Sequence, residues 1–537
     1  MRTLSEILES CTQDYLSSLN PINPPPPQEI EHQVLDAVSH AIAIENTVRD
    51  TPNRLPRLHE LKCAQIADIM THLYSVKRIA MNSVDTDPDY DIIGIYQAEG
   101  PDAGLYVTDE DSIRRIARQF KYSLSKRDTE EILIALRDKA PRAKRCLDRD
   151  LIPVNNGIFN YKTKELQPFT PDLVFLTKSR VDYNPDAKNI TIHNDDDGTD
   201  WDVESWFHTL SDDPEIVQLL WEILGAIVRP NVRWNKSAWL YSDLGNNGKG
   251  TLCELMRNLC GPSSYASIPL ASFSSDFMLE PLIRSSAIIV DENDVGLYID
   301  QSANLKAVIT NDVILINRKF KSPIAYQFFG FMVQCLNEFP RIKDKSDSFA
   351  RRQLFVPMTK CFTGHERKYI KTDYIHRKEV LEYVLHKVLH TNYYVLSEPE
   401  ACRAVLAEYR MYNDPIRQFY DEIVETQCTW DLLPFAFLYE VYKAWFRENI
   451  PNGSIQGRNK FIQDLTTLAA SGDTWVCKDK NKRIRTANLM DRTEPLILRY
   501  NIDTWMNKSY RGDDPKKICR PELAESYRGL VRKTQLS

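Results

Sequence analysis

Apolar and polar positions along the chain follow two spacings in turn, one helical and one extended. Helical spacing is clearest in three segments, at residues 28–48, 215–227 and 378–389. Compact apolar runs bounded by polar or turn-forming residues predict strands at 92–96, 104–107, 238–241, 287–290 and 330–336. Because the two patterns alternate through most of the chain, the sequence predicts an α/β fold.

Changes in pattern and composition divide the chain into five predicted segments. Residues 1–61 form a helical N-terminal appendage that contains a Pro-rich linker. Residues 62–205 form an N-terminal α/β domain, and residues 206–400 form a larger α/β core. A small C-terminal domain follows at 401–510, and a basic tail at 511–537 ends the chain.

The most specific motif lies between the strand at 238–241 and a helix-like run that begins at Leu252. It is a small, flexible turn followed by a lysine: Gly245, Asn246, Asn247, Gly248, Lys249, Gly250 and Thr251. Glycine lets the backbone approach a phosphate and direct N–H groups toward it, and the lysine adds a charge for the outer phosphates. The motif therefore predicts a nucleoside triphosphate site.

Two positions depart from the usual P-loop pattern. Asp243 stands where the first glycine is expected, and Gly250 follows the lysine where Ser or Thr is usual. We therefore expect the hydroxyl that holds Mg²⁺ to come from Thr251, and a metal-bound water is the alternative. Taken alone, the turn is also compatible with a tight strand–helix connection whose lysine is solvated.

Polar residues end the next two predicted strands. Asp291 and Glu292 follow the strand at 287–290. Asp291 suits the Mg²⁺ shell, and Glu292 suits a base that orients and deprotonates the attacking water. Asn337 follows the strand at 330–336, where its amide can sense the outer phosphate or position water. An isolated Asn at such a place is also typical of a turn.

Two basic segments accompany these strands. Arg351 and Arg352 precede an apolar run and suit a finger that reaches the phosphates of a neighbouring subunit, although a surface ion-pair cluster is the alternative. Arg318, Lys319 and Lys321 surround one aromatic residue. Such a group suits contact with a nucleic-acid backbone and stacking on a base, and a solvated charged face is its alternative.

In this order the motifs resemble those of the superfamily 3 helicases of the phage, plasmid and poxvirus primase-helicase type. The matching residues are Asn247-Gly248-Lys249, Asp291-Glu292, Arg318-Lys319, Asn337-Glu338-Phe339-Pro340-Arg341 and Arg351-Arg352. Leu336 stands where Thr is common, and Gly250 is the larger departure. The resemblance covers residues 62–500 and implies an AAA+-like P-loop ATPase core, ATP and Mg²⁺ as ligands, a ring-shaped homo-hexamer, and single-stranded DNA in its central channel.

The segment at 401–510 is similar to the winged-helix modules that this family often carries. Two amphipathic helical faces, at 438–446 and 461–469, precede a basic, hairpin-like segment that includes Lys482, Arg483 and Arg485. This order predicts a winged-helix-like DNA-binding domain with a basic wing. A helical protein-interaction domain is the alternative.

Composition narrows the possible partners. The net charge is −7 over 537 residues, so basic groups that contact DNA must be gathered locally, as around a pore. No apolar run reaches bilayer length, and no membrane partner is expected. The 11 cysteines lack Cys-x-x-Cys pairs and zinc spacing, which indicates buried thiols in a reducing compartment. We expect the cytoplasm of a bacterial host cell.

Together the motifs and the resemblance predict an ATP-dependent replicative DNA helicase of a phage or mobile genetic element. Expected partners are single-stranded DNA, replication-fork or origin DNA, other copies of the chain, and a separate primase or other replication proteins. A primase domain is not expected here, because about 60 residues before residue 62 are too few for one. Two alternatives stay open: a non-unwinding origin-binding initiator ATPase and a small-molecule P-loop phosphotransferase.

Overall fold

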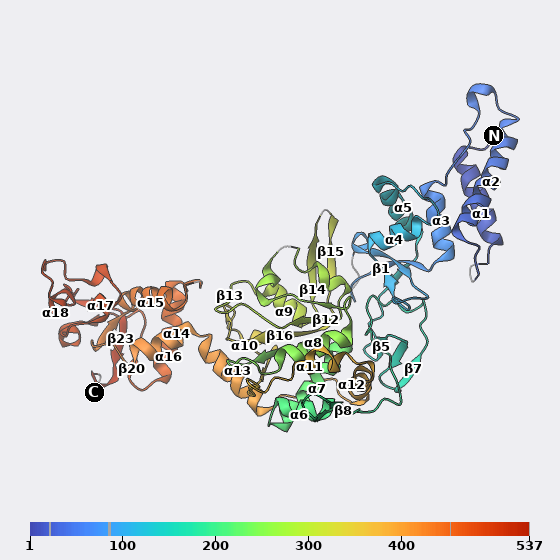
Figure 1. Ribbon diagram of the computed structural model, residues 1–537. Helices are drawn as coiled ribbons and strands as arrows, with labels where there is room; N and C mark the ends of the chain where they lie inside the picture. Colours follow the sequence, from blue (N-terminus) through green and yellow to red (C-terminus); the bar gives the residue numbers. More distant parts are fainter. Residues whose placement is uncertain (21–22, 84–86, 276, 320, 452, 536–537) are drawn as a thin grey trace.

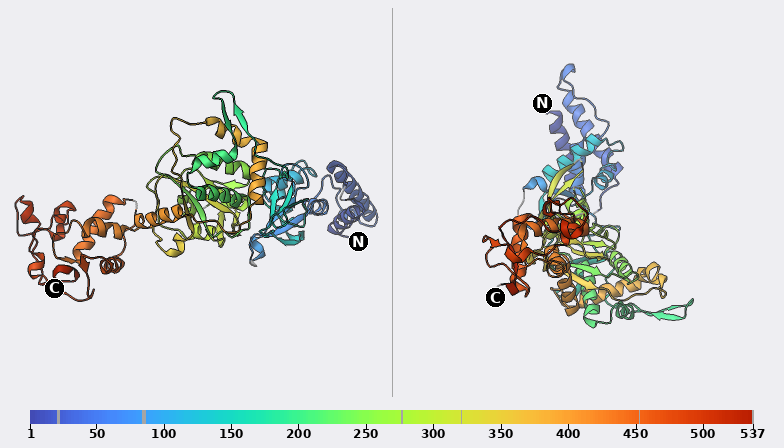
Figure 2. Two further views of the ribbon diagram at one scale, coloured as in Figure 1. Left: turned by 90° about the horizontal axis from the view of Figure 1, so that it is seen from below. Right: turned by 90° about the vertical axis from the view of Figure 1, so that its left-hand side faces the viewer.

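The computed structural model describes residues 1–20, 23–83, 87–275, 277–319, 321–451 and 453–535. Within these residues the chain is a mixed α/β protein with several sheets and many helices, which confirms the predicted fold class in this general form. Figures 1 and 2 show an elongated arrangement, with the N-terminal helices at one end, the C-terminal region at the other, and the largest α/β region between them. None of the helices in the described ranges is long and apolar enough to cross a bilayer.

The largest sheet has five parallel strands in the order β11-β12-β16-β10-β18. Their bounds are Tyr265–Ala266 (β11), Ala287–Val290 (β12), Phe331–Leu336 (β16), Ser237–Tyr241 (β10) and Gln353–Pro357 (β18). The strands read as nearly continuous apolar runs because both faces of the sheet are covered. Since all the strands run the same way, the residues that follow β10, β12 and β16 lie close together at the C-terminal ends of these strands.

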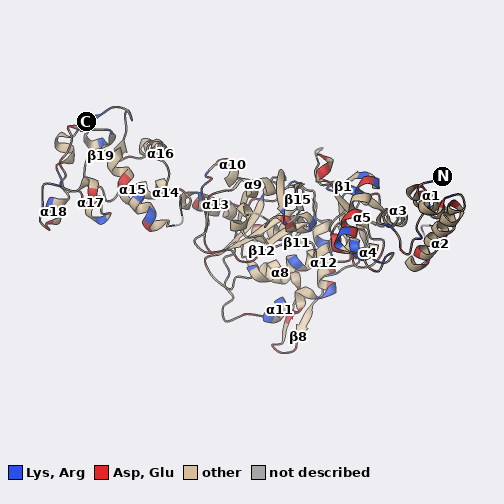
Figure 3. Cartoon of the chain, turned by 90° about the horizontal axis from the view of Figure 1, so that it is seen from above, with Lys and Arg blue, Asp and Glu red and all other residues tan. Residues whose placement is uncertain are grey.

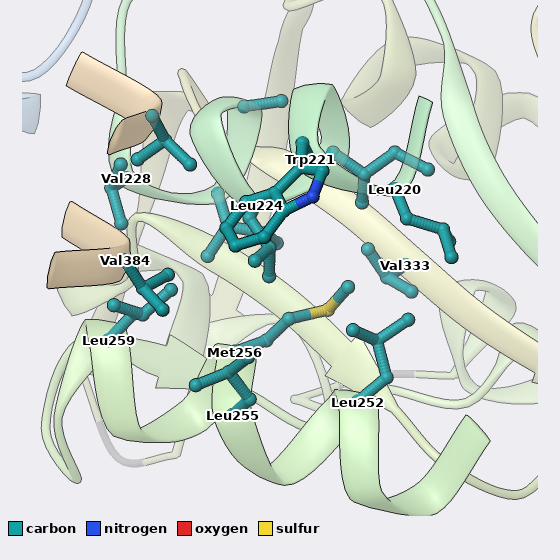
Figure 4. Packing of buried hydrophobic residues seen from close by; sticks show 14 of the residues in the cluster. Leu220, Trp221, Leu224, Val228, Leu252, Leu255, Met256, Leu259, Val333 and Val384 are labelled. Carbon is teal, nitrogen blue, oxygen red and sulfur yellow. The ribbon is translucent and has the colours of Figure 1, made fainter. Parts of the chain in front are cut away.

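Helices cover one face of this sheet. They are α6 (Val203–Leu210), α7 (Pro214–Val228), α8 (Lys249–Cys260), α11 (Lys368–Thr372) and α12 (Lys378–His390). Figure 4 shows Met256 and Leu259 of α8 packed between Leu224 of α7, Val384 of α12 and Val333 of the sheet. This packing fixes α8, and with it Lys249 at its first position, relative to the strands.

The opposite face of the sheet carries a second core. It is formed with α9 (Ala303–Ile309), α13 (Glu400–Tyr412), α10 (Asp347–Ala350) and the antiparallel hairpin of β14 (Val313–Arg318) and β15 (Lys321–Gln327). Ala238 and Leu240 of β10 pack in the first core, whereas Trp239 packs in the second. Successive side chains of a strand point to opposite faces, so one short strand contributes to both cores.

The N-terminal region has its own core. Its elements are α1 (Leu4–Ser18), α2 (Pro27–Asn46), α3 (Cys63–Leu73), α4 (Glu110–Ala117), α5 (Lys126–Lys139) and a sheet in the order β3 (Tyr106–Val107), β2 (Ile92–Tyr96), β1 (Val76–Ala80), β4 (Arg142–Lys144). Leu16 of α1 and Val34 of α2 pack with Ile66 and Met70 of α3. The predicted boundary at residue 61 therefore passes through this core.

Short strands connect the N-terminal region with the large sheet. They are β5 (Leu151–Val154), β6 (Gly157–Asn160), β7 (Glu165–Gln167), β8 (Ile192–Asn194) and β9 (Thr199–Trp201). Val154 and Trp201 pack in the same core as α7 and α12, so the predicted boundary at residue 205 also passes through a core. The acidic residues 195–197 lie in the exposed turn of the β8-β9 hairpin.

The C-terminal region has a separate core that follows α13. Its elements include α14 (Pro415–Phe419), β19 (Leu432–Pro434), α15 (Phe435–Asn449), α16 (Arg458–Ser471), β20 (Trp475–Val476), β21 (Ile484–Arg485), α17 (Leu496–Arg499), α18 (Pro515–Ile518), β22 (Ser526–Tyr527) and β23 (Gly529–Arg532). The structure differs here from the predicted basic tail. The strand β23 lies between β19 and β20, and its Leu530 and Val531 are buried.

We predict that Leu255→Ala lowers the free energy of unfolding of the central core by about 2–5 kcal/mol, because the side chain is fully buried and its loss leaves a cavity. Leu315→Ala is the matched control, since that side chain is 55% exposed, and it should cost less than about 0.5 kcal/mol. Urea unfolding of the two variants measures the difference. Equal losses would contradict the packing described here.

Candidate nucleotide site

The loop between β10 and α8 has a backbone that requires glycine at one position. Gly248 has a φ of 85°, and a Cβ there would lie 2.8 Å from Cδ2 of Leu210. Asn246 has a φ of 52°, in the left-handed region that Asn tolerates better than most residues. Gly245, by contrast, has open space around it. The turn thus positions Lys249 and the first turn of α8 beside the end of β10.

The side chain of Lys249 is buried at the edge where β10 and β16 end. Its Nζ donates to the carbonyl oxygens of Ser242 at 3.3 Å and Leu336 at 3.1 Å, and to Oδ1 of Asn337 at 2.9 Å. Burial lowers the pKa of the ammonium, because charge is poorly solvated there. The sequence motif and the residue after β16 are therefore joined by one direct contact.

Asp291, directly after β12, faces a cation from α8. Its carboxylate accepts from Nη2 of Arg257 at 2.9 Å, and Arg257 also pairs with Glu254 at 3.2 Å. The hydrogen bond from Arg257 holds the pKa of Asp291 below its usual range. A metal ion at Asp291 would compete with this guanidinium, and the 42% exposed carboxylate is accessible to such an ion.

Glu292 is exposed, and the next residue fixes the loop that carries it. This residue, Asn293, is buried. Its Oδ1 accepts from the backbone N–H of Leu270 at 2.9 Å. Its Nδ2 donates to Oε1 of Gln334 and to the carbonyl of Cys335, both at 3.0 Å. These bonds tie the end of β12 to β16. Asn293 carries no recognisable sequence motif, because its partners lie 23 residues earlier and about 40 residues later in the chain.

One pocket of about 880 Å³ brings the predicted residues together. It is lined by residues 245–251 and by Asp291, Glu292 and Asn337. Thr251 and Asp291 thus share a cavity, and a hydroxyl with a carboxylate is an oxygen donor set of the kind that Mg²⁺ accepts. Two polar strand ends and a glycine-rich turn that are distant in sequence converge because β12, β16 and β10 are parallel neighbours.

The opposite wall of the pocket was not predicted from the sequence. It consists of residues from β9 and α6, including Trp201 and Trp206, and of a segment at 362–371. The backbone N–H of Phe362 donates to the carbonyl of Asn246 at 2.7 Å, and Nδ2 of Asn246 donates to Oε1 of Glu366 at 3.1 Å. The loop at residues 245–251, called the phosphate loop after its predicted role, is therefore held directly against this segment.

Arg351 and Arg352 do not line this pocket. They precede β18, and Ser237 at the start of β10 is in register with Gln353 at the start of β18. The length of β10 therefore separates them from the phosphate loop by about 13 Å. Nη1 of Arg352 donates to Oγ of Ser348 at 3.0 Å, and Arg351 is exposed. The arginines thus lie near the N-terminal ends of β10 and β18, whereas the pocket lies at the C-terminal ends of the strands.

The predicted basic hairpin is the β14-β15 hairpin. Arg318 donates to the carbonyl of Ser322 through Nε at 3.0 Å and Nη2 at 2.8 Å, and burial lowers the pKa of its guanidinium. Lys319 is exposed near the turn. The side chain of Lys321 lies outside the described part of the structure. Figure 1 shows that the hairpin projects from the central region.

The basic residues of the C-terminal region do not form a hairpin of their own. The strand β21, which contains Arg485, pairs with β22 from about 40 residues later. Arg483 donates through Nη2 to the carbonyl of Ser526 at 2.7 Å, while Lys482 is exposed. Figure 3 shows Lys and Arg interspersed with Asp and Glu from one end of the chain to the other.

Three family models match the chain. They are "D5 N terminal like" at residues 65–223, "Family of unknown function (DUF5906)" at residues 240–352, and "Poxvirus D5 protein-like" at residues 412–495. The two D5 models match on either side of the pocket-forming sheet and confirm the resemblance noted from the motifs. The chain is thus similar to D5-type, superfamily 3 helicase-like proteins over residues 65–223 and 412–495. D5-like domains of the primase-helicase type indicate a replication protein of a phage or virus.

Solved structures with a weaker similarity include apo structures of the C-terminal region of NrS-1. The first is 14% identical, with a TM-score of 0.40, and covers 80% of this chain and 98% of that one. A second, the A form, is 14% identical, with a TM-score of 0.40, and covers 82% and 92%. This likeness is too weak to support a conclusion about function. No curated protein matches the chain.

We predict that Arg257→Gln raises the pKa of Asp291 back toward its usual range, because it removes the hydrogen bond and the charge that favour the carboxylate. Asp291 should then take up its proton at a higher pH than in the wild-type chain. Titration of ¹³C-labelled aspartate side chains by NMR measures the change. Glu254→Gln is the control, since it leaves the Arg257–Asp291 pair intact, and an unchanged titration in Arg257→Gln would refute the assignment.

Proposed function

We propose that this chain is an ATP-driven DNA helicase that works in replication as a homo-hexamer. In this proposal Lys249 and the N–H groups of residues 245–250 bind the phosphates of ATP. Thr251 and Asp291 hold Mg²⁺, which neutralises phosphate charge when bound. Glu292 orients and deprotonates the attacking water, and Asn337 couples the outer phosphate to the end of β16.

The observation that carries this proposal is the contact between Lys249 and Asn337 inside the shared pocket. A buried ammonium that donates only to carbonyl and amide oxygens is incompletely compensated, so a phosphate is a favourable additional partner. The carboxylates of Asp291 and Glu292 line the same space. Phosphate binding and water activation can therefore occur in one cavity.

The strand order supports an AAA+-like core. The strand that precedes the phosphate loop, β10, lies between β16 and β18, and β12 with its two acids lies on the far side of β16. The C-terminal helices α15 and α16, with the sheet β19-β23-β20, support a winged-helix-like module. Single-stranded DNA, and fork or origin DNA, are the nucleic-acid partners in this proposal, with a separate primase among possible replication partners.

The position of the arginines supports action between subunits. Arg351 and Arg352 lie near the N-terminal ends of β10 and β18, away from the pocket. They are therefore too far away to contact the phosphates of a nucleotide bound in the pocket of their own chain. In a closed ring of identical head-to-tail contacts, the arginines of one chain would lie beside the pocket of the next chain. The proposed cell compartment is the cytoplasm of a bacterial host.

We predict that Lys249→Ala reduces DNA-stimulated ATP hydrolysis by at least about 100-fold, because the charge that stabilises the transferred phosphate is lost. Phosphate release with and without single-stranded DNA measures this. Strand displacement on a forked duplex then separates a helicase from an initiator that hydrolyses ATP without unwinding. Undiminished DNA-stimulated hydrolysis by Lys249→Ala would contradict the site.

Subunit mixing tests whether the arginines act in trans. The two variants are Lys249→Ala and the double variant Arg351→Ala/Arg352→Ala, and each should be inactive alone. In a 1:1 mixture about a quarter of the subunit interfaces should be active. These are the interfaces at which a subunit with an intact Lys249 meets a neighbour with both arginines intact. Mixing Lys249→Ala with Glu292→Gln is the control and should regain none, because those two residues serve the same pocket. Recovery in neither mixture would contradict the trans arrangement.

A further inference from the structure

The space beside Gly250, the residue after the P-loop lysine, is filled by a side chain from the other side of the pocket. Gly250 stands where a serine or threonine hydroxyl is usual, and a Cβ built there would lie 3.4 Å from Nζ of Lys371. No other atom of the described residues would come within 4 Å of that Cβ, apart from its own helix backbone and chain neighbours. The ammonium of Lys371 thus lies beside the space that a metal-binding hydroxyl fills in other P-loops.

Lys371 reaches this place from a well-anchored segment. It lies on α11, whose Ile370 is buried in the core that also contains α8. Nδ2 of Asn258 on α8 donates to the carbonyl of Ile375 at 3.0 Å, just after α11. On the other side, Glu366 and Phe362 are bonded to Asn246 of the phosphate loop. The distance between Lys371 and Gly250 is therefore set by packing on both sides.

The ammonium of Lys371 is available for a ligand. In the described part of the chain it has neither a hydrogen bond nor an ion-pair partner within 4 Å, although its charge helps to hold the pKa of Asp291 down. The side chain is exposed and lines the pocket that Lys249 also lines. Two cations on opposite walls of one pocket, one buried and one accessible, form a complement to a polyanion.

We propose that Lys371 binds phosphate oxygens of the nucleotide and occupies the place left by the missing hydroxyl at position 250. This inference rests on the proposed nucleotide site and adds a residue to it. A direct lysine contact makes part of the nucleotide affinity independent of Mg²⁺, because the ammonium neutralises charge that a metal ion otherwise neutralises alone. It also links the 362–371 segment to the occupancy of the phosphate loop.

The test is binding of a fluorescent ATP analogue to the full chain in EDTA and in Mg²⁺. In EDTA, Lys371→Ala should bind about 10- to 100-fold more weakly than wild type, as expected for loss of a hydrogen bond to a charged group, and Lys371→Arg should retain most of the affinity. In Mg²⁺ the loss should be smaller. Arg377→Ala is the control, since it removes a nearby exposed charge that does not line the pocket.

A second arm uses the glycine itself. Gly250→Ser in the Lys371→Ala background should strengthen binding in Mg²⁺ but not in EDTA, because it supplies a hydroxyl for the metal ion and no charge for the phosphates. If Lys371→Ala binds as tightly as wild type in EDTA while Lys249→Ala does not bind, the role of Lys371 is overturned and the nucleotide site stands. If wild type itself does not bind the analogue, both are overturned.

Discussion

The ammonium of Lys249 is the group on which the site depends. It is buried where β10 and β16 end, and it donates to Ser242, Leu336 and Asn337. No carboxylate of the described residues lies within ion-pair distance of it. The fold thus holds a positive charge whose hydrogen-bond partners are neutral oxygens, beside an open pocket, and in the proposed function a phosphate group supplies the compensating charge.

The parallel order of the sheet determines which residues can act together. Parallel neighbouring strands end on the same side of the sheet. The residues that follow them therefore lie close together: the turn after β10, the acids after β12 and the amide after β16. The same order holds Arg351 and Arg352 near the start of β18, away from these residues. A ring of subunits is therefore the arrangement in which all the predicted groups could meet around one nucleotide.

The local parts of this arrangement could be predicted from the sequence. The strand–turn–helix at 238–260, the apolar strand before Asp291 and the helices at 215–227 and 378–389 each depend on spacing within about 20 residues. The order of the motifs along the chain then carried the resemblance to a family, which implied their roles. Glycine, lysine and paired acids carry a recognisable pattern because their chemistry restricts what can replace them.

Contacts between distant segments left no such pattern. Arg257 reads as an ordinary i, i+3 partner of Glu254, and its contact with Asp291 depends on how α8 packs against β12. Lys371 lies more than 100 residues after Gly250, in a segment without a motif. The sequence predicts a basic tail where β23 lies, because the short apolar run there stands among charged residues, and it becomes a strand only by pairing with β19 and β20.

The central claim is that a nucleoside triphosphate binds with its phosphates between Lys249 and the segment at 362–371. A structure of the chain with a non-hydrolysable ATP analogue, Mg²⁺ and single-stranded DNA tests it most directly. The account predicts phosphate density within hydrogen-bonding distance of Nζ of Lys249 and the backbone of residues 245–250, with an arginine of a neighbouring copy beside the outermost phosphate. An analogue bound elsewhere, with Lys249 still held by Ser242, Leu336 and Asn337, would contradict it.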